Sequence, residues 1–308
     1  MKRVVFLSVA GDFHASVVGQ TLLRRFGPGL KLSIIDMDER SESGGFSLDI
    51  SSRDGSGSVL IKDNLGEWIG LDETDLIWCR RFTRDQRKDN SGFLTNQWNS
   101  ASWSLAHFSK TKWIDRPRDI IDAENKPVQL HYASEAGFQI PNTLVSQDPD
   151  RIKTFFCSQD GEVIVKPLKA SIKKQIFTVS LPEDSFEQQD QFSSFPAIYQ
   201  QKIGGDTHFR IVCLPNAIFT FVIQSNELDW RKNRDVKIQK IETDPQIAKQ
   251  CKLLLKNLNL TMGIIDAKKS GDQIFFLEIN PQGQFLFLEA MTGFNLRNAY
   301  AEYFLESL

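Results

Sequence analysis

Apolar and polar residues in the first third of the chain follow two different periods. Short apolar runs at 3–10, 30–38 and 76–82 have the length and composition of buried strands. Apolar residues recur at helical spacing over 17–26, and a second helical stretch is predicted at about 91–109. A strand–helix–strand order is typical of a parallel sheet, so we expect the chain to begin with a β-α-β unit.

Beyond residue 120 the pattern changes to short strands with few helices between them. A helix is predicted at 125–136, where Gly137 ends it, and an edge-like extended segment follows. A later helix is predicted to have Asp244 as its N-cap and Pro245 as its first residue. Strands are predicted at 162–168, 175–181, 197–203, 208–214, 217–225, 264–268 and 273–280, with amphipathic helices after Gly283. This part is therefore expected to be an α+β structure rich in antiparallel strands.

The composition narrows the class of protein. The 308 residues allow two or more domains, and 41% hydrophobic with 25% charged residues is ordinary for a soluble protein. The net charge of −2 gives no sign of a nucleic-acid partner, and no apolar run is long enough to span a membrane. The cysteines stand far apart without a paired motif, which fits reduced thiols and predicts a cytoplasmic protein.

Several common catalytic motifs do not occur in the sequence. It has no Gly-Lys pair for a Walker-type phosphate loop and no GxGxxG for a dinucleotide. It also has no HExxH zinc motif and no GxSxG nucleophile elbow. The histidines are scattered at His14, His107, His131 and His208, and none stands in a pattern that marks a catalytic base. These chemistries are set aside.

The stretch FFLEIN at 275–280 places polar side chains at the end of an apolar strand. Because strand side chains alternate, Glu278 and Asn280 are predicted to share one face, with Phe275, Leu277 and Ile279 on the other. A carboxylate and an amide oxygen two residues apart suit a hard cation such as Mg²⁺. The alternative is a strand end whose polar residues simply reach water.

Other polar residues fall on neighbouring strands. Lys166 lies inside the apolar run VIVKPL, where a lysine is costly unless it meets an anion. Asp206 and Arg210 flank the start of a later strand, and Asp266 lies one hairpin before Glu278. Folding that hairpin brings the acidic residues together, and three oxygen ligands can hold Mg²⁺ bridged to phosphates.

This order of residues resembles the ATP-grasp superfamily, in which two subdomains grip ATP between two antiparallel sheets. The implied fold is α/β and α+β: an N-terminal β-α-β pre-ATP-grasp domain at 1–115, a central subdomain at 116–203 and a C-terminal subdomain at 204–308. By resemblance the nucleotide contacts are Lys126, Lys166, Gln201, Lys202, Ile203, Asp206 and Arg210, and the metal ligands are Asp266, Glu278 and Asn280. The implied cofactors are ATP and Mg²⁺.

Longer pieces resemble one branch of that superfamily more closely. They are SNELDWRKN at 225–233, LEINPQGQFLFLEAMTGFNL at 277–296, VAGDFHASVV and LIWCRRF. Together they are similar to the microviridin-type peptide ligases, or graspetide synthetases, including the branch that accompanies a radical-SAM-type peptide maturation system. One departure is the loop after EVIVK, which lacks the glycines frequent in ATP-grasp phosphate loops; Lys169, Ser171, Lys173 and Lys174 are its candidate replacements.

The resemblance implies a ligase for a ribosomal precursor peptide. Such enzymes activate an Asp or Glu side chain as an acyl phosphate and join it to a Ser or Thr hydroxyl (ester) or a Lys amine (amide). The implied catalytic residues are Arg210, Asp229 and Arg231, and the implied substrate contacts are Arg80, Arg81 and Arg231. Asp229 either accepts the proton of the attacking hydroxyl or orients Arg231. At least one of Arg80 and Arg81 is instead a structural ion-pair partner between subdomains.

Two other functions stay open at this level. One is an ATP-grasp ligase for a small molecule or a protein tail, similar to glutathione synthetase or a glutamate ligase. The other is a protein that binds nucleotide or peptide without catalysis. The resemblance also implies a homodimer and a groove for the leader of the precursor, which we expect beside the central strands and the segment 183–195.

Overall fold

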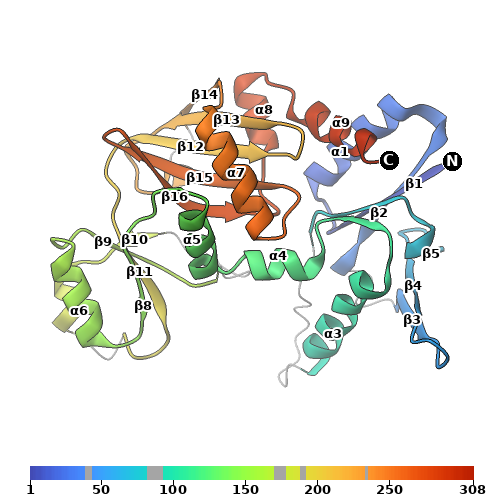
Figure 1. Cartoon of the computed structure of the whole chain (residues 1–308), viewed down its shortest axis with the longest axis horizontal. Coiled ribbons are helices and arrows are strands. Elements are labelled where there is room, and N and C mark those ends of the chain that lie inside the picture. The colour runs from blue at the N-terminus through green and yellow to red at the C-terminus, as the bar shows by residue number, and fades with distance from the viewer. Residues whose placement is uncertain (39–43, 82–92, 170–177, 188–191, 233–234) are drawn as a thin grey trace.

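The computed structural model describes residues 1–38, 44–81, 93–169, 178–187, 192–232 and 235–308 (Figure 1). The described α-helices are α1 (Phe13–Phe26), α3 (Phe93–Phe108), α4 (Pro117–Ala123), α5 (Lys126–Glu135), α6 (Pro149–Ser158), α7 (Pro245–Asn257), α8 (Leu286–Thr292) and α9 (Leu296–Glu306). The first strands are β1 (Lys2–Ser8), β2 (Leu30–Asp36), β3 (Phe46–Ile50), β4 (Gly57–Lys62), β5 (Trp68–Gly70), β6 (Leu76–Cys79), β7 (Lys112–Ile114) and β8 (Thr143–Ser146). The later strands are β9 (Val163–Lys166), β10 (Val179–Ser180), β11 (Ala197–Gln201), β12 (Thr207–Cys213), β13 (Ile218–Gln224), β14 (Lys237–Ile241), β15 (Gly263–Ser270) and β16 (Gln273–Asn280).

The N-terminal sheet has the order β2-β1-β6-β7 and is parallel throughout, which confirms the predicted β-α-β start. Helix α1 has Asp12 as its N-cap, whose Oδ1 accepts the backbone N–H groups of His14 and Ala15 at 2.8 and 3.2 Å. Its apolar stripe packs in one core with α9 and the inner strands, so the two ends of the chain lie side by side (Figure 1). A small antiparallel sheet, β3-β4-β5, adjoins this part.

The segment after α3 differs from the prediction. The stretch IDRPRD at 114–119 holds the end of strand β7 and the start of helix α4, and neither element was predicted. Pro117 is the first residue of α4, with Arg116 as its N-cap. Proline at that position begins a helix, because the missing N–H has no intrahelical partner in any case.

The central sheet has the order β10-β9-β11-β8 and is antiparallel. Helix α6 covers one face, where Ile152 and Phe156 pack with Val163 and Tyr199. Residues 175–177 of the strand predicted at 175–181 lie outside the described residues, and its described part contains the short strand β10. Lys173, Lys174 and Ser171 also lie outside the described residues.

The C-terminal sheet has five strands in the order β14-β13-β12-β15-β16, all antiparallel. One face is apolar and packs against α5 and α7 (Figure 1). Helix α7 begins as predicted, with Asp244 accepting the N–H groups of Gln246 and Ile247 at 2.8 and 3.0 Å and Pro245 in the first turn. Because strand side chains alternate, the polar residues of β12, β15 and β16 emerge on the opposite face.

A β-bulge in β16 changes which of its side chains share a face, compared with the prediction. Asp266 pairs with Glu278, but the next residue, Ala267, pairs with Phe276, so Leu277 is the extra residue. Phe276 and Ile279 are therefore the side chains that enter the apolar core. The prediction that Phe275, Leu277 and Ile279 share one face is wrong, because simple alternation does not continue through a bulge.

The division of the chain at 115 and 203 stays a prediction. Figure 1 shows the N-terminal sheet on the right, the C-terminal sheet in the upper centre and the central sheet at the lower left. None of the helices within the described ranges combines the length and apolar character needed to cross a membrane.

Candidate active site

Three charged side chains form a row across adjacent strands of the C-terminal sheet. Arg210 on β12 lies opposite Asp266 on β15, and Asp266 lies opposite Glu278 on β16. Arg210 Nη1 donates to both carboxylate oxygens of Asp266 at 2.8 and 2.9 Å, and its Nη2 donates to the Gln284 carbonyl at 2.8 Å. Burial raises the pKa of Asp266, while the Arg210 guanidinium opposes that rise.

Asn280 and Lys126 complete the carboxylate end of this row. Asn280 Nδ2 lies 3.3 Å from Asp266 Oδ2 and 3.4 Å from Glu278 Oε1. Lys126, the first residue of α5, forms an ion pair with Glu278. Burial would raise the pKa of Glu278, but Lys126, Lys166 and Arg231 outweigh it and lower the pKa to about 2. Glu278 is thus an anion at neutral pH.

Lys166 approaches the same cluster from the central sheet. It ends β9 on the face opposite α6, where it pairs in register with Ile198 of β11. Burial lowers the pKa of Lys166 to about 8; Glu278 opposes this change and Lys126 adds to it. The two sheets therefore converge on one group of cations and carboxylates, as the sequence predicted for a lysine that needs an anion.

Asp229 and Arg231 form a closed two-point ion pair in the loop after β13. Arg231 Nε and Nη2 donate to the two oxygens of Asp229 at 2.7 and 2.6 Å, and the Arg231 backbone N–H adds a bond of 3.2 Å. Asp229 is 6% exposed, whereas Arg231 is 47% exposed and lies within the field of Glu278 and Asp266. Because both Asp229 oxygens are taken by Arg231, this geometry favours the orienting role for Asp229 over proton acceptance.

Aromatic contacts connect this loop to Arg210. Trp230 packs against Phe287 of α8 with ring centroids 5.7 Å apart, and the Arg210 guanidinium lies 5.6 Å from the same ring. Phe287 therefore contacts both Arg210 and Trp230, the residue that precedes Arg231.

The predicted nucleotide contacts at the end of β11 have partners other than the residues of this charge cluster. Gln201 exchanges backbone and side-chain hydrogen bonds with Asn142, and Lys202 pairs with Glu162 at 2.7 Å. Ile203 is buried and Asp206 is exposed. Gly205 follows with φ of +96°, and a Cβ there would lie 2.3 Å from the Lys269 carbonyl oxygen. Only glycine suits this crossing between the two sheets.

Arg80 and Arg81 lie at the boundary between the N-terminal sheet and the C-terminal part. Arg80 is 2% exposed; its Nη1 donates to the Gln282 carbonyl and its Nε lies 3.5 Å from Asp12 Oδ2. Arg81 is 33% exposed, with its Nε 3.6 Å from the same oxygen. These contacts favour the structural ion-pair alternative for Arg80 and leave Arg81 as the more accessible predicted substrate contact.

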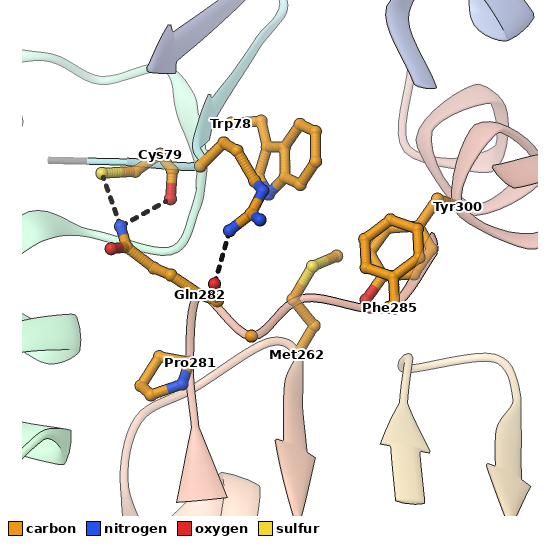
Figure 2. Close-up of a pocket in the computed structure, with 9 residues that line it drawn as sticks. Trp78, Cys79, Met262, Pro281, Gln282, Phe285 and Tyr300 are labelled. Atoms are coloured by element: carbon orange, nitrogen blue, oxygen red, sulfur yellow. Dashed lines mark hydrogen bonds between the residues drawn. The ribbon is translucent and has the colours of Figure 1, made fainter. Parts of the chain in front are cut away.

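The turn that follows Asn280 is held from the N-terminal sheet. Gln282 Nε2 donates to the Cys79 carbonyl at 3.2 Å, and Phe285 stacks on Tyr300 at 4.0 Å (Figure 2). These residues line one small pocket with Trp78, Met262 and Pro281. No role was predicted for Gln282 or Tyr300, since nothing local in the sequence shows that they meet.

Two further residues were missed. His14 Nε2 accepts the backbone N–H groups of Phe285 and Leu286 at 3.0 and 3.2 Å. Gln129 on α5 is buried; its Nε2 donates to the Ile279 carbonyl at 2.8 Å and its Oε1 accepts the Ile279 N–H at 3.1 Å. Both act across more than a hundred residues of sequence, where no spacing rule applies.

The chemistry of the donor set fits a hard divalent cation. Asp266, Glu278 and Asn280 offer only oxygen ligands, and Mg²⁺ takes a few such ligands alongside phosphate oxygens and water. Within the described ranges, no group of three or more His, Cys, Asp or Glu side chains is placed to hold a metal. The assignment of Asn280 as the third ligand stays a prediction. The adjacent cations Lys126, Lys166 and Arg210 match the charge of phosphates.

Neither a family model nor a curated protein sequence matches the chain, but solved structures do. Macrocyclase MdnC from Microcystis aeruginosa MRC, bound with precursor peptide MdnA, is 25% identical with a TM-score of 0.81, over 97% of this chain and 98% of that chain. A Chryseobacterium gregarium RiPP-associated ATP-grasp ligase, in complex with ADP and a leader and core peptide, is 21% identical with a TM-score of 0.84, over 100% of this chain and 98% of that chain. The ATP-grasp ligase PsnB, complexed with minimal precursor, Mg and ADP, is 18% identical with a TM-score of 0.79, over 99% and 96%. The predicted fold and the predicted resemblance are thereby confirmed: the chain has the ATP-grasp fold, in the form found in RiPP-associated ATP-grasp ligases.

Proposed function

We propose that this protein is an ATP-dependent carboxylate ligase that forms macrocycles in a ribosomal precursor peptide. The observation that carries the proposal is the row Arg210–Asp266–Glu278, closed by Lys126 and Lys166 from the facing elements. This is a set of oxygen ligands beside phosphate-binding cations. The structures similar to this chain include ligases solved with precursor peptides and with ADP and Mg, which supports the same reaction class here.

The reaction has two balanced steps. The side-chain carboxylate of a peptide Asp or Glu attacks the γ-phosphorus of ATP, forming an acyl phosphate and releasing ADP. A Ser or Thr hydroxyl, or a Lys amine, of the same peptide then attacks the acyl carbon. Phosphate leaves, the nucleophile loses one proton, and an ester or amide remains. Catalysis rests on positioning and charge neutralisation, because the phosphoryl group itself needs little covalent help.

Each charged residue is assigned a role in this reaction from its position in the site. Lys126, Lys166 and Arg210 neutralise the phosphate oxygens from three sides. Asp266, Glu278 and Asn280 are the residues that would hold Mg²⁺, which when bound supplies charge stabilisation for the transferring phosphoryl group. We place the adenosine of the nucleotide at the end of β11 by the resemblance, beside the backbone of Gln201, Lys202 and Ile203, with Asp206 near the ribose.

Arg231 is the proposed anchor for the reacting carboxylate or its acyl phosphate. It is half exposed and its fork geometry suits a planar carboxylate. Asp229 fixes the guanidinium plane through the two-point contact, so Arg231 does not have to be ordered by the substrate. Arg81 is a second contact for an acidic core peptide, whereas Arg80 serves the fold.

The finer expectations rest on the family resemblance. We place the leader of the precursor beside the central strands and the segment 183–195, of which residues 188–191 lie outside the described residues. We also expect a homodimer in the cytoplasm, organised as three domains at 1–115, 116–203 and 204–308. Light scattering on the purified protein tests the dimer, since a monomeric mass at working concentration contradicts it.

The proposal is tested by incubating a candidate precursor peptide with the protein, ATP and Mg²⁺ and measuring the mass of the peptide by mass spectrometry. Loss of one water per ring together with ADP release is the expected result. Glu278→Gln is the matched inactive variant, because it keeps the side-chain shape but removes the charge. ADP release with mass gain from an added amine points to the small-molecule ligase instead. A secured precursor that binds without ADP release points to the binding-only protein.

A further inference from the structure

Helix α8 carries Phe287, yet its own N-terminal residue supplies no side-chain cap. The cap comes from the other end of the chain. His14 Nε2 accepts the Phe285 and Leu286 N–H groups at 3.0 and 3.2 Å, across 271 and 272 residues of sequence. The first N–H groups of a helix have no intrahelical acceptor, so a cap there fixes where and at what angle the helix begins.

The imidazole is itself held in place. Its ring meets Phe285 edge-on at 4.8 Å, and Phe285 stacks on Tyr300 of α9. Its Nδ1 lies 3.7 Å from Asp12 Oδ1, on the carboxylate that also caps α1. Because Nε2 accepts two N–H groups, the ring proton must be on Nδ1, the side that faces Asp12.

Two of the proposed catalytic groups depend on the helix that His14 caps. Phe287, one residue after the capped Leu286, lies under the Arg210 guanidinium and against Trp230. Arg210 also bonds the Gln284 carbonyl just before the helix. A shift in the start of α8 would therefore move the supports of Arg210 and of the loop that carries Arg231 together.

We propose that His14 is a positioning residue of the ligase: as an acceptor from the N-terminal domain, it sets the start of α8 and so aligns Arg210 with Arg231. This inference rests on the proposed function, because it is the ligase reaction that needs the two arginines aligned. The groups that face the ring from the packed elements are Asp12, Arg80, Arg81 and Arg210. Burial, and to a smaller extent the charge of Arg80, lowers the pKa of His14 to about 4. The ring is therefore neutral near pH 7, and its Nε2 can accept hydrogen bonds.

Two variants separate the hydrogen-bond acceptor of His14 from its aromatic ring, and a third serves as the control. His14→Phe keeps the aromatic body against Phe285 but removes the acceptor. His14→Gln places an amide oxygen near the Nε2 position and so retains an acceptor without the ring. His131→Ala is the matched control, since His131 is an exposed histidine on the surface of α5. Peptide kcat, the KM for ATP, and hydrogen exchange of segments 281–292 and 225–232 are measured for each.

We expect His14→Phe to lower kcat about tenfold or more with little change in the KM for ATP, because misplaced groups lose rate rather than ground-state binding. Exchange should rise in both segments, and His14→Gln should restore kcat and exchange protection. Unchanged kcat and exchange in His14→Phe would overturn the proposal. So would a loss in His14→Gln equal to that in His14→Phe. Failure of the wild-type protein to form any ring would instead contradict the proposed function, and the exchange measurement would still test the cap.

Discussion

Asp266 and Glu278 lie directly opposite each other on adjacent strands, yet they take their counter-charges from different parts of the fold. Asp266 is paired with Arg210 of the same sheet, and Glu278 with Lys126 at the start of α5. Two like charges in neighbouring positions are thus neutralised separately. A divalent cation would meet the two carboxylates, and a polyphosphate would meet the two cations that pair with them here.

Arg210→Ala is expected to destabilise the fold as well as abolish ligation. Arg210 is 8% exposed and Asp266 16% exposed, so the substitution leaves an unpaired carboxylate in a mostly buried place, at a cost of about 3 kcal/mol. Urea unfolding measures the loss. Arg118→Ala, which breaks an exposed pair with Asp122, should change stability by less than about 1 kcal/mol. Equal effects of the two substitutions would contradict the assigned burial.

Glu278→Gln should weaken Mg·ADP binding about tenfold or more, because a neutral amide is a poor ligand for Mg²⁺. Lys126→Met should also weaken it by removing a phosphate-side cation. Calorimetry with and without Mg²⁺ separates the two. The dependence of ADP affinity on Mg²⁺ should nearly vanish in Glu278→Gln and persist in Lys126→Met. The reverse pattern would contradict the assignment of Glu278 to the metal and Lys126 to the phosphates.

Asp229→Asn tests how Arg231 is held. Losing the two-point ion pair should free the guanidinium, so peptide kcat is expected to fall about tenfold while Mg·ADP affinity stays near that of the wild type. Steady-state kinetics across pH distinguishes the remaining alternative. If Asp229 were the proton acceptor, the rate of Asp229→Asn should recover as pH rises and the nucleophile ionises unaided; an orienting Asp229 gives a flat, reduced profile.

Stability should fall between about pH 6.5 and pH 4. Burial first, then neighbouring cations, lowers the pKa values of His14 and His208 to about 4 from 6.5. The unfolded chain then binds more protons in that window, so each histidine's contribution is complete above pH 6.5 and is lost as pH falls towards 4, by up to about 3 kcal/mol. Urea unfolding at several pH values measures the slope. His14→Gln should reduce the dependence of the unfolding free energy on pH, and His131→Ala should not. An unaltered slope in His14→Gln would show that His14 does not contribute to the loss of stability.

Gly283→Ala should destabilise the turn after Asn280. A Cβ there would lie 2.8 Å from Ile264 Cδ1 and 2.9 Å from its Cβ, so backbone must move, at about 1–3 kcal/mol. At Gly204 the nearest atom to an added Cβ is Ser270 Oγ at 3.9 Å, which makes Gly204→Ala a matched control. Thermal unfolding compares the two, and tolerance of alanine at both positions would contradict the tight packing of the turn.

The sequence predicted best what is set by neighbouring residues. Asp244 and Pro245 identified the start of α7, and the hairpin between β15 and β16 brought Asp266 to Glu278, because the turn fixes the pairing of its own strands. The bulge at Leu277 was missed, since a single extra residue leaves no mark in an apolar run. Helix α6 and strands β4, β5 and β14 were also not predicted.

The site was predicted as a set of charges but without its supports. Arg80 resembled a substrate contact in sequence, and only the tertiary structure shows it nearly inaccessible against Gln282. His14 had no distinguishing pattern because its partners are 271 and 272 residues away. Contacts of that range depend on how whole sheets and helices pack, which no local spacing encodes.

The two bonds between Gln129 and Ile279 have a consequence for the outer border of the C-terminal sheet. Strand β16 is the last strand on that side, and an open last strand can template the addition of another chain. The Gln129 amide satisfies both backbone groups of Ile279 as a neighbouring strand would, and the Gln139 carbonyl accepts the Phe276 N–H at 2.8 Å. The strand that carries Glu278 and Asn280 is therefore closed to intermolecular β-pairing at these positions, and an extended peptide has to reach these residues from the sheet's face rather than along its border.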